Sequence, residues 1–158
     1  MTKTEPDGKA QRNLTDPESR ILKTKDGYIQ GYNAQAAVDA QAQIIVAHGL
    51  THGMSDQDQL VPLVDGIKDN LGRKPKEASA DAGYCSEANL AALAERDVSA
   101  YLATGRAKRP TEGRANIVGP LTQAMRDKLK RAGWRTRYRL RKQVVEPVFG
   151  QIKQPRGF

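Results

Sequence analysis

The amino-acid sequence predicts an α/β fold in which helices cover a partly parallel sheet. Two short strand candidates, residues 77–82 and 98–103, are separated by a helix candidate at 87–96. An amphipathic helix candidate precedes the first of these strands and ends at Gly72. Because strands and helices alternate, we expect right-handed crossovers that join parallel strands.

The N-terminal part predicts extended structure after a polar leader. Residues 1–18 carry proline, glycine, asparagine and charges without apolar periodicity, so we expect a flexible leader. A short extended segment follows at 20–24, with a turn signal at 25–27. Residues 28–39 and 41–50 then predict a β-hairpin, because they combine imperfect alternation with a short apolar run.

The first long helix is predicted from its apolar spacing. Ser55 suits an N-cap, and Asp56 and Asp58 stand in the first turn, where the helix dipole favours acids. The apolar residues after them recur at i, i+3, i+4, i+7 and i+11, which is typical of an amphipathic helix: Leu60, Leu63, Val64, Ile67 and Leu71.

The C-terminal third predicts a loop and two helices. Residues 104–120 carry glycine, proline and basic residues with few apolar ones, so we expect a basic loop. A helix candidate begins at Leu121, and a last helix is expected at about 135–153. Pro147 lies inside that last helix and predicts a kink or a fresh helix start.

Charge is distributed unevenly along the chain. Residues 105–158 hold 15 Lys/Arg and 3 Asp/Glu, a net charge of +12, whereas residues 1–104 hold 11 and 15, a net charge of −4. Charge concentrated in one third of a chain favours a polyanionic partner, and we interpret it as a face or tail for nucleic acid. General solubility charge is the alternative explanation.

Composition limits the other function classes. The 158 residues suit one domain of ordinary size, and no apolar run approaches the ~20 residues that cross a bilayer. The polar N-terminus lacks the apolar core of a secretion signal. Cys85 is the single cysteine, which excludes an internal disulfide and fits the reducing cytoplasm, where we expect the protein.

Two carboxylates could carry chemistry. Asp81 ends a predicted strand, and the carboxyl ends of strands in α/β sheets face the crevice where ligands bind. A magnesium ion needs only one or two carboxylates besides waters and phosphate oxygens. The alternative for Asp81 is a turn or N-cap role. Glu146 shares a helical face with Lys142 and Lys153, so the alternative for Glu146 is a surface ion pair.

Four segments occur in an order that resembles the C-terminal half of bacterial insertion-sequence transposases of the DDE type: 15–20, 25–39, 80–84 and 141–153. This resemblance implies a ribonuclease H-like mixed sheet flanked by helices. It also implies acids that bind Mg²⁺ or Mn²⁺ and activate water, and later a DNA 3′-hydroxyl, against a phosphodiester.

The resemblance also assigns roles to individual residues. Asp81 and Glu146 match the family's second and third catalytic acids, which are its metal ligands. The basic and aromatic residues around Glu146 would hold the DNA strand and its terminal phosphate: Tyr138, Arg141, Lys142 and Lys153.

One part of the family's pattern has no counterpart in this sequence. The first aspartate of the family stands in an Asp-Gly-Thr type segment on a central strand, and no such segment occurs here. We therefore expect residues 19–158 to form a partial catalytic domain, truncated at both ends. A missing central strand leaves unpaired edges, which predicts marginal stability and little strand transfer.

Three functions stay open at this point. The first is that of a DDE transposase fragment, whose parent activity is metal-dependent DNA cleavage and strand transfer at the ends of an insertion sequence. The second is that of a non-catalytic DNA-binding remnant, or a regulator of a full-length transposase. A ribonuclease H-like nuclease is a third, weaker reading. The expected partners are the terminal repeats of the DNA, with a homodimer or a full-length transposase as protein partners and no membrane.

Overall fold

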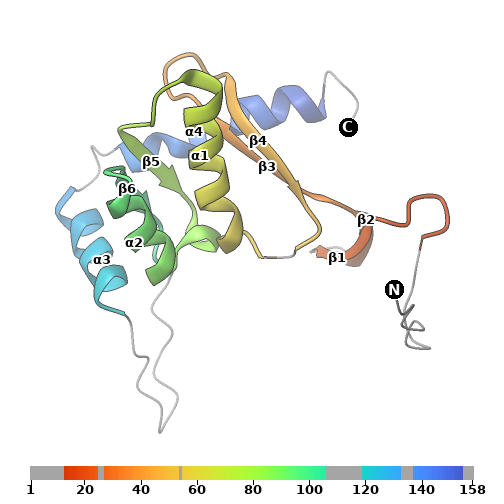
Figure 1. Ribbon diagram of the computed structural model, residues 1–158, viewed down its shortest axis with the longest axis horizontal. Coiled ribbons are helices and arrows are strands. Elements are labelled where there is room, and N and C mark those ends of the chain that lie inside the picture. Colours follow the sequence, from red (N-terminus) through yellow and green to blue (C-terminus); the bar gives the residue numbers. More distant parts are fainter. Residues whose placement is uncertain (1–12, 25–26, 54, 106–118, 133–136, 155–158) are drawn as a thin grey trace, which may run out of the picture. The chain divides into compact units, whose positions relative to one another are not determined.

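The computed structural model describes residues 13–24, 27–53, 55–105, 119–132 and 137–154 (Figure 1). The chain divides into two compact units. The first comprises Met1–Ala34 with Leu50–Met54, and the second comprises Gln35–Gly49 with Ser55–Phe158.

The first unit is built on a β-hairpin. Strands β1 (Arg20–Thr24) and β2 (Gly27–Gly31) pair antiparallel. The hydroxyl of Tyr32 donates to the Asp16 carboxylate at 2.9 and 3.0 Å, and the ring of Tyr32 lies 5.2 Å from that of His52. Most of the expected leader, residues 1–12, lies outside the described residues.

The next two strands form a second hairpin. Strands β3 (Asn33–Val38) and β4 (Ile45–Thr51) are hydrogen-bonded to each other. Asp39 closes their turn, because its N–H donates to the Ile44 carbonyl at 2.9 Å and its carboxylate accepts from two backbone N–H groups. The predicted hairpin of residues 28–39 with 41–50 is therefore confirmed for β3 and β4, but residues 28–31 do not belong to it. They pair back onto β1, a closer partner along the chain that costs less loop-closure entropy.

The long helix of the second unit starts later than expected. A 3₁₀ turn, η1 (Gln57–Gln59), precedes α1 (Leu60–Leu71). Ser55 does not cap α1, because its hydroxyl accepts from the N–H of Gln57 at 3.3 Å inside this turn. The C-terminal signal was correct: Gly72 adopts φ +67° and donates its N–H to the Lys68 carbonyl.

The predicted parallel pair of strands is confirmed. Strand β5 (Glu77–Ala80) lies parallel to β6 (Ser99–Leu102), with Ala80 opposite Leu102. Between them run the 3₁₀ turn η2 (Ala82–Tyr84) and helix α2 (Glu87–Glu95), which is capped by the Ser86 hydroxyl.

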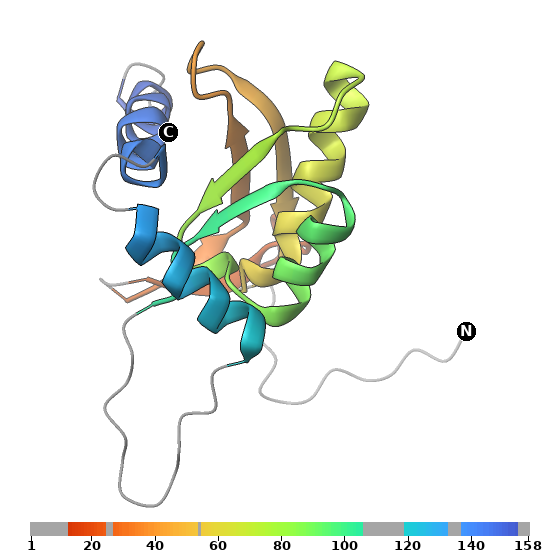
Figure 2. The ribbon, with the colours of Figure 1, turned by 90° about the vertical axis from the view of Figure 1, so that its left-hand side faces the viewer.

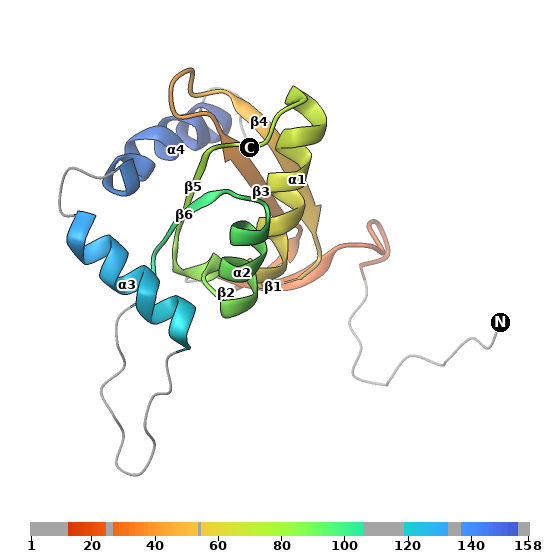
Figure 3. The same ribbon diagram turned by 60° about the vertical axis from the view of Figure 1, so that its left-hand side comes forward.

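Helices lie on both sides of this strand pair. Figure 2 shows β5 and β6 between α1 and α2 on one side and α4 (Arg137–Lys153) on the other. Helix α3 (Pro120–Ala132) packs against α2 and β6 (Figure 3). The buried core comes from these elements: Leu60, Val64, Leu90, Leu93, Val98, Ala100, Leu102 and Met125.

The α/β class is confirmed, but the described strands do not form the expected mixed sheet. The described strands make three separate two-stranded sheets, β1–β2, β3–β4 and β5–β6. Each strand pairs with its neighbour in the sequence or across one crossover helix. Such local pairing requires the least ordering of the chain.

Three further expectations concern the C-terminal part. Most of the expected basic loop, residues 106–118, lies outside the described residues. Helix α4 lies close to the expected bounds and continues through Pro147, so no fresh helix starts there. In the described part of the chain, the helices are too short or too polar to cross a bilayer.

Candidate active site

Asp81 directly follows β5 and caps the turn after it. Its Oδ1 accepts a hydrogen bond from the Gly83 N–H at 2.9 Å, and the residue has an extended backbone. The capping role that the sequence left open for Asp81 is therefore real. Asp81 is exposed, and within the described residues its second carboxylate oxygen has no hydrogen-bond partner, so the cap leaves capacity for a ligand.

A second carboxylate lies beside the same turn. A Cβ atom added to Gly83 would lie 3.0 Å from Asp56 Oδ2 and 3.2 Å from Asp81 Oδ1. The two carboxylate oxygens are therefore no farther apart than the sum of these distances. Glycine at this position leaves the room that both carboxylates occupy.

A buried amide connects Asp56 to the end of the turn. The side chain of Gln35, on β3, donates from Nε2 to Asp56 Oδ1 at 2.8 Å. Its Oε1 accepts from the hydroxyl of Tyr84, the last residue of η2. Burial, followed by the charges of Asp56 and Asp81, raises the pKa of Tyr84 to about 12. The phenol therefore stays protonated at neutral pH and acts as a donor.

A second buried amide fastens the backbone of this region. Asn89, on α2, donates from Nδ2 to the Gln57 carbonyl at 2.7 Å and to the Tyr84 carbonyl at 2.8 Å. It thereby ties turn η1 to turn η2, which are in contact. Both amides are buried and hydrogen-bonded, as buried polar groups generally are.

Glu146 lies on α4 and is exposed. Within the described residues it has no hydrogen bond and no ion pair, and the alternative of a Lys142–Glu146 pair does not form. Val148, two residues on, is buried, and α4 contacts β5, the strand that leads into Asp81. The helix of Glu146 and the strand before Asp81 therefore pack together.

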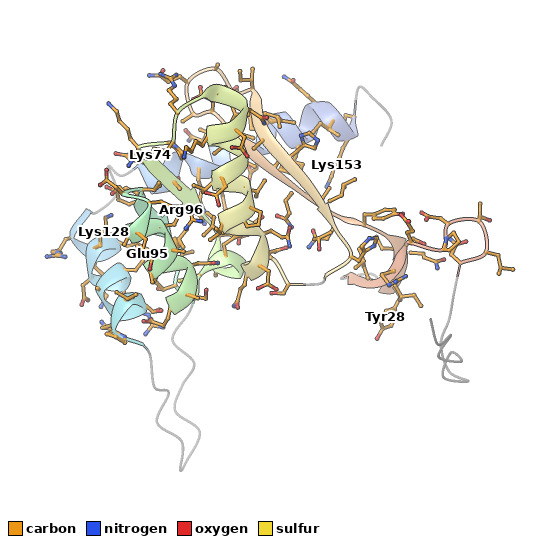
Figure 4. The ribbon with its side chains drawn as sticks, in the orientation of Figure 1. Tyr28, Lys74, Glu95, Arg96, Lys128 and Lys153 are labelled. Carbon is orange, nitrogen blue, oxygen red and sulfur yellow. The ribbon has the colours of Figure 1, made fainter. Side chains whose placement is uncertain are left out.

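The expected DNA-binding residues all belong to α4. Arg141 is half-buried, whereas Lys142 and Lys153 are exposed. Figure 4 shows Lys153 on the last turn of this helix. Tyr138 lies in the first turn, but its side chain is outside the part of the chain that the structure describes.

The acids in the described part of the chain do not form a complete metal cage. Among the described residues, no group of three or more histidine, cysteine, aspartate or glutamate side chains is arranged to hold a metal ion. Asp81 and Glu146 supply hard oxygen donors, and both are exposed and form no ion pair with another described residue. Such donors suit magnesium, which keeps several of its waters and takes its remaining ligands from one or two carboxylates and the substrate.

Sequence reasoning did not assign Gln35, Asp56 or Tyr84 to the site. Asp56 was expected only as a first-turn acid of a helix. Gln35 and Tyr84 lie in the family-like segments 25–39 and 80–84, but no role was assigned to either. The three residues are joined by side-chain contacts across 21 and 49 positions of the chain. No local spacing encodes contacts of that kind.

A comparison with protein families decides the class of protein. The family model described as transposase DDE domain matches residues 4–158. The chain belongs to the DDE transposase family. No match was found among curated proteins or among solved structures. The transposase motifs quoted from the sequence therefore fall within the matched part of the chain, and they include both Asp81 and Glu146.

Proposed function

We propose that this transposase chain contributes two acids, Asp81 and Glu146, to a divalent-metal site for DNA cleavage and strand transfer at insertion-sequence ends. The observation that carries this proposal is the family match over residues 4–158, combined with the position of Asp81 at the carboxyl end of a parallel strand. The proposed setting is a ribonuclease H-like domain that acts in the cytoplasm.

The residues fit a magnesium or manganese ion by their donor chemistry. Asp81 has a carboxylate oxygen that the turn does not use, and Glu146 is exposed on a helix that contacts β5. A bound ion of this kind polarises phosphate oxygens and favours the attacking hydroxyl of water or of a DNA end. The protein side chains would hold the ion and keep it beside the DNA.

Basic residues would hold the DNA itself. Lys142 and Lys153 are exposed on the helix of Glu146, and Arg141 and Tyr138 precede them along the same helix. Cations along a helix neutralise phosphates without reading the base sequence, so this contact would position the strand. The ends of the insertion sequence are the proposed substrate.

We expect strand transfer by this chain alone to be weak. The family motifs identified in the sequence supply two acids, whereas the family's two-metal site uses three. Labelled terminal repeats, incubated with the protein and Mg²⁺, Mn²⁺ or EDTA, test the proposal. Metal-dependent nicking that is lost in Asp81→Asn supports the assignment of Asp81. Efficient strand transfer by the chain alone would contradict the expectation that two acids support this reaction poorly.

A second function is favoured by the charge distribution. The net charge of +12 on residues 105–158 would support DNA binding that needs no metal. Such a chain could occupy the ends used by a full-length transposase, or pair with that protein. Salt-dependent binding that is unchanged by EDTA, without nicking under any condition, would favour this regulator over the nuclease.

A further inference from the structure

We propose that Gln35 is a positioning residue for Asp81, and that it acts by clamping turn η2 between Asp56 and Tyr84. The proposal rests on the proposed function, in which Asp81 holds a divalent ion. Gln35 is 6% exposed and hydrogen-bonds to Asp56 and to Tyr84, so its role would be exerted through these neighbours.

The two ends of the Gln35 amide have different partners. The NH₂ group faces a carboxylate oxygen of Asp56, and the carbonyl oxygen accepts from the Tyr84 hydroxyl. Rotating the amide by half a turn would bring its oxygen against the carboxylate, which is repulsive. The amide therefore has one favourable orientation, and it fixes both neighbours at once.

Both neighbours bear on the turn that carries Asp81. Tyr84 is the last residue of the turn, and Asp56 Oδ2 lies beside Gly83, whose N–H binds Asp81 Oδ1. Movement of the turn away from β3 would break the bond to Tyr84. Movement of Gly83 toward η1 would bring it into the Asp56 carboxylate. The turn is thereby held from two sides, and with it the Asp81 carboxylate.

The backbone anchor of Asn89 separates positioning from folding. Asn89 binds the Gln57 and Tyr84 carbonyls independently of Gln35. Loss of the Gln35 amide therefore leaves η1 and η2 tied together, while the side chains between them lose their fixed arrangement. We expect Gln35→Met, which keeps the length of the side chain without its hydrogen bonds, to fold and to bind the ion less tightly.

Manganese binding to the full chain tests the proposal. Mn²⁺ broadens the amide resonances near its binding site, so the Gly83 amide reports occupancy during a titration. We expect Gln35→Met to raise the half-saturating Mn²⁺ concentration about tenfold, the lower end of the effect of removing a group that orients a ligand. Tyr84→Phe should raise it less. The double variant should match Gln35→Met, because the one hydrogen bond that Tyr84→Phe removes, from Tyr84 to Gln35, is already lost in Gln35→Met.

A matched control distinguishes positioning from general destabilisation. Arg96→Gln breaks the two-bond pairing with Asp65 that joins α2 to α1, away from the turn. It should lower thermal stability without changing the Mn²⁺ titration. If Gln35→Met binds Mn²⁺ like the wild type, or if Arg96→Gln weakens binding equally, the positioning role is wrong. If the wild type shows no broadening that Asp81→Asn removes, the metal role of Asp81 is wrong, and the positioning role with it.

Discussion

The carboxylates of Asp56 and Asp81 approach the same point beside Gly83. A Cβ atom there would lie 3.0 Å from an oxygen of one and 3.2 Å from an oxygen of the other. One carboxylate is held by the buried amide of Gln35, and the other by the Gly83 N–H. A small turn after a parallel strand thus places two acids together, and only one of them belongs to the family motif.

Replacing Gly83 by alanine should weaken metal binding more than it weakens the fold. The added methyl group would force one carboxylate to move. Alanine also lowers the conformational entropy of the unfolded chain, which stabilises the folded state by about 0.4–1 kcal/mol. We expect severalfold weaker Mn²⁺ binding with a thermal midpoint close to that of the wild type. Gly66→Ala is the control, since its Cβ would make an ordinary 3.5 Å contact with Ala47. Equal Mn²⁺ affinity in the wild type and Gly83→Ala would mean that a side chain at this position does not displace the Asp56 or Asp81 carboxylate.

The ion pair of Asp65 with Arg96 should make stability depend on pH. The hydrogen bond from Arg96 holds the pKa of Asp65 below its ordinary value of 3.8. The stabilisation is therefore complete above pH 3.8 and is lost as pH falls through the lowered pKa. We expect Asp65→Asn to be slightly less stable than the wild type at pH 7, and the gap to close below pH 3.8. Both side chains are partly exposed, so added salt should reduce the gap. A gap that widens on acidification would contradict this account.

Glu87 should hold the start of α3. Its carboxylate accepts from the N–H groups of Leu121 and Thr122, at 3.1 and 2.7 Å, and from the Thr122 hydroxyl at 2.5 Å. The hydrogen bond from the Thr122 hydroxyl is the largest of the contacts that lower the pKa of Glu87. We expect Glu87→Ala to speed hydrogen exchange at the Leu121 and Thr122 amides, measured by NMR. Glu95 is an exposed residue of α2, the helix that also carries Glu87. Glu95→Ala should leave hydrogen exchange at both amides unchanged. Unaltered exchange in Glu87→Ala would mean that the cap does not form in solution.

Leu93 should be essential to the core of the second unit. Its side chain is fully buried, and truncation to alanine in such a site costs about 2–5 kcal/mol. The sequence also predicts marginal stability, so this loss would leave little of the folded state. We therefore expect Leu93→Ala to show little or no cooperative transition in a urea titration. Leu121→Ala is the control, since Leu121 is exposed. A sharp, high-enthalpy calorimetric transition in the wild type would argue against marginal stability.

Local signals predicted the elements of the second unit well. Apolar spacing identified α1, and the left-handed glycine Gly72 marked its end. The parallel pairing of β5 with β6 followed from strand and helix alternation. Residues 28–31 were assigned to the wrong hairpin, although the turn signal at 25–27 already connects them to residues 20–24. Strand propensity alone does not say which of two flanking segments such residues pair with.

The site was predictable only where it is continuous in sequence. The family motifs pointed to Asp81 and Glu146, because each stands in a recognisable segment. Gln35, Asp56 and Tyr84 come from three separate elements, and their hydrogen bonds exist only after β3, η1 and η2 have packed. The same packing explains why Asp56 serves the turn of Asp81 and not the helix that its position suggested.

One Mn²⁺ titration tests most directly whether Asp81 and Glu146 share a metal site. The backbone amides of Gly83 and Glu146 are followed together by NMR in the wild type, Asp81→Asn, Glu146→Gln and the exposed control Glu95→Gln. The account predicts that both amides broaden at the same Mn²⁺ concentration in the wild type and in Glu95→Gln. It also predicts that either site variant removes both effects. Broadening at Gly83 that persists in Glu146→Gln, with the Glu146 amide unaffected in the wild type, would show that the two acids do not share an ion.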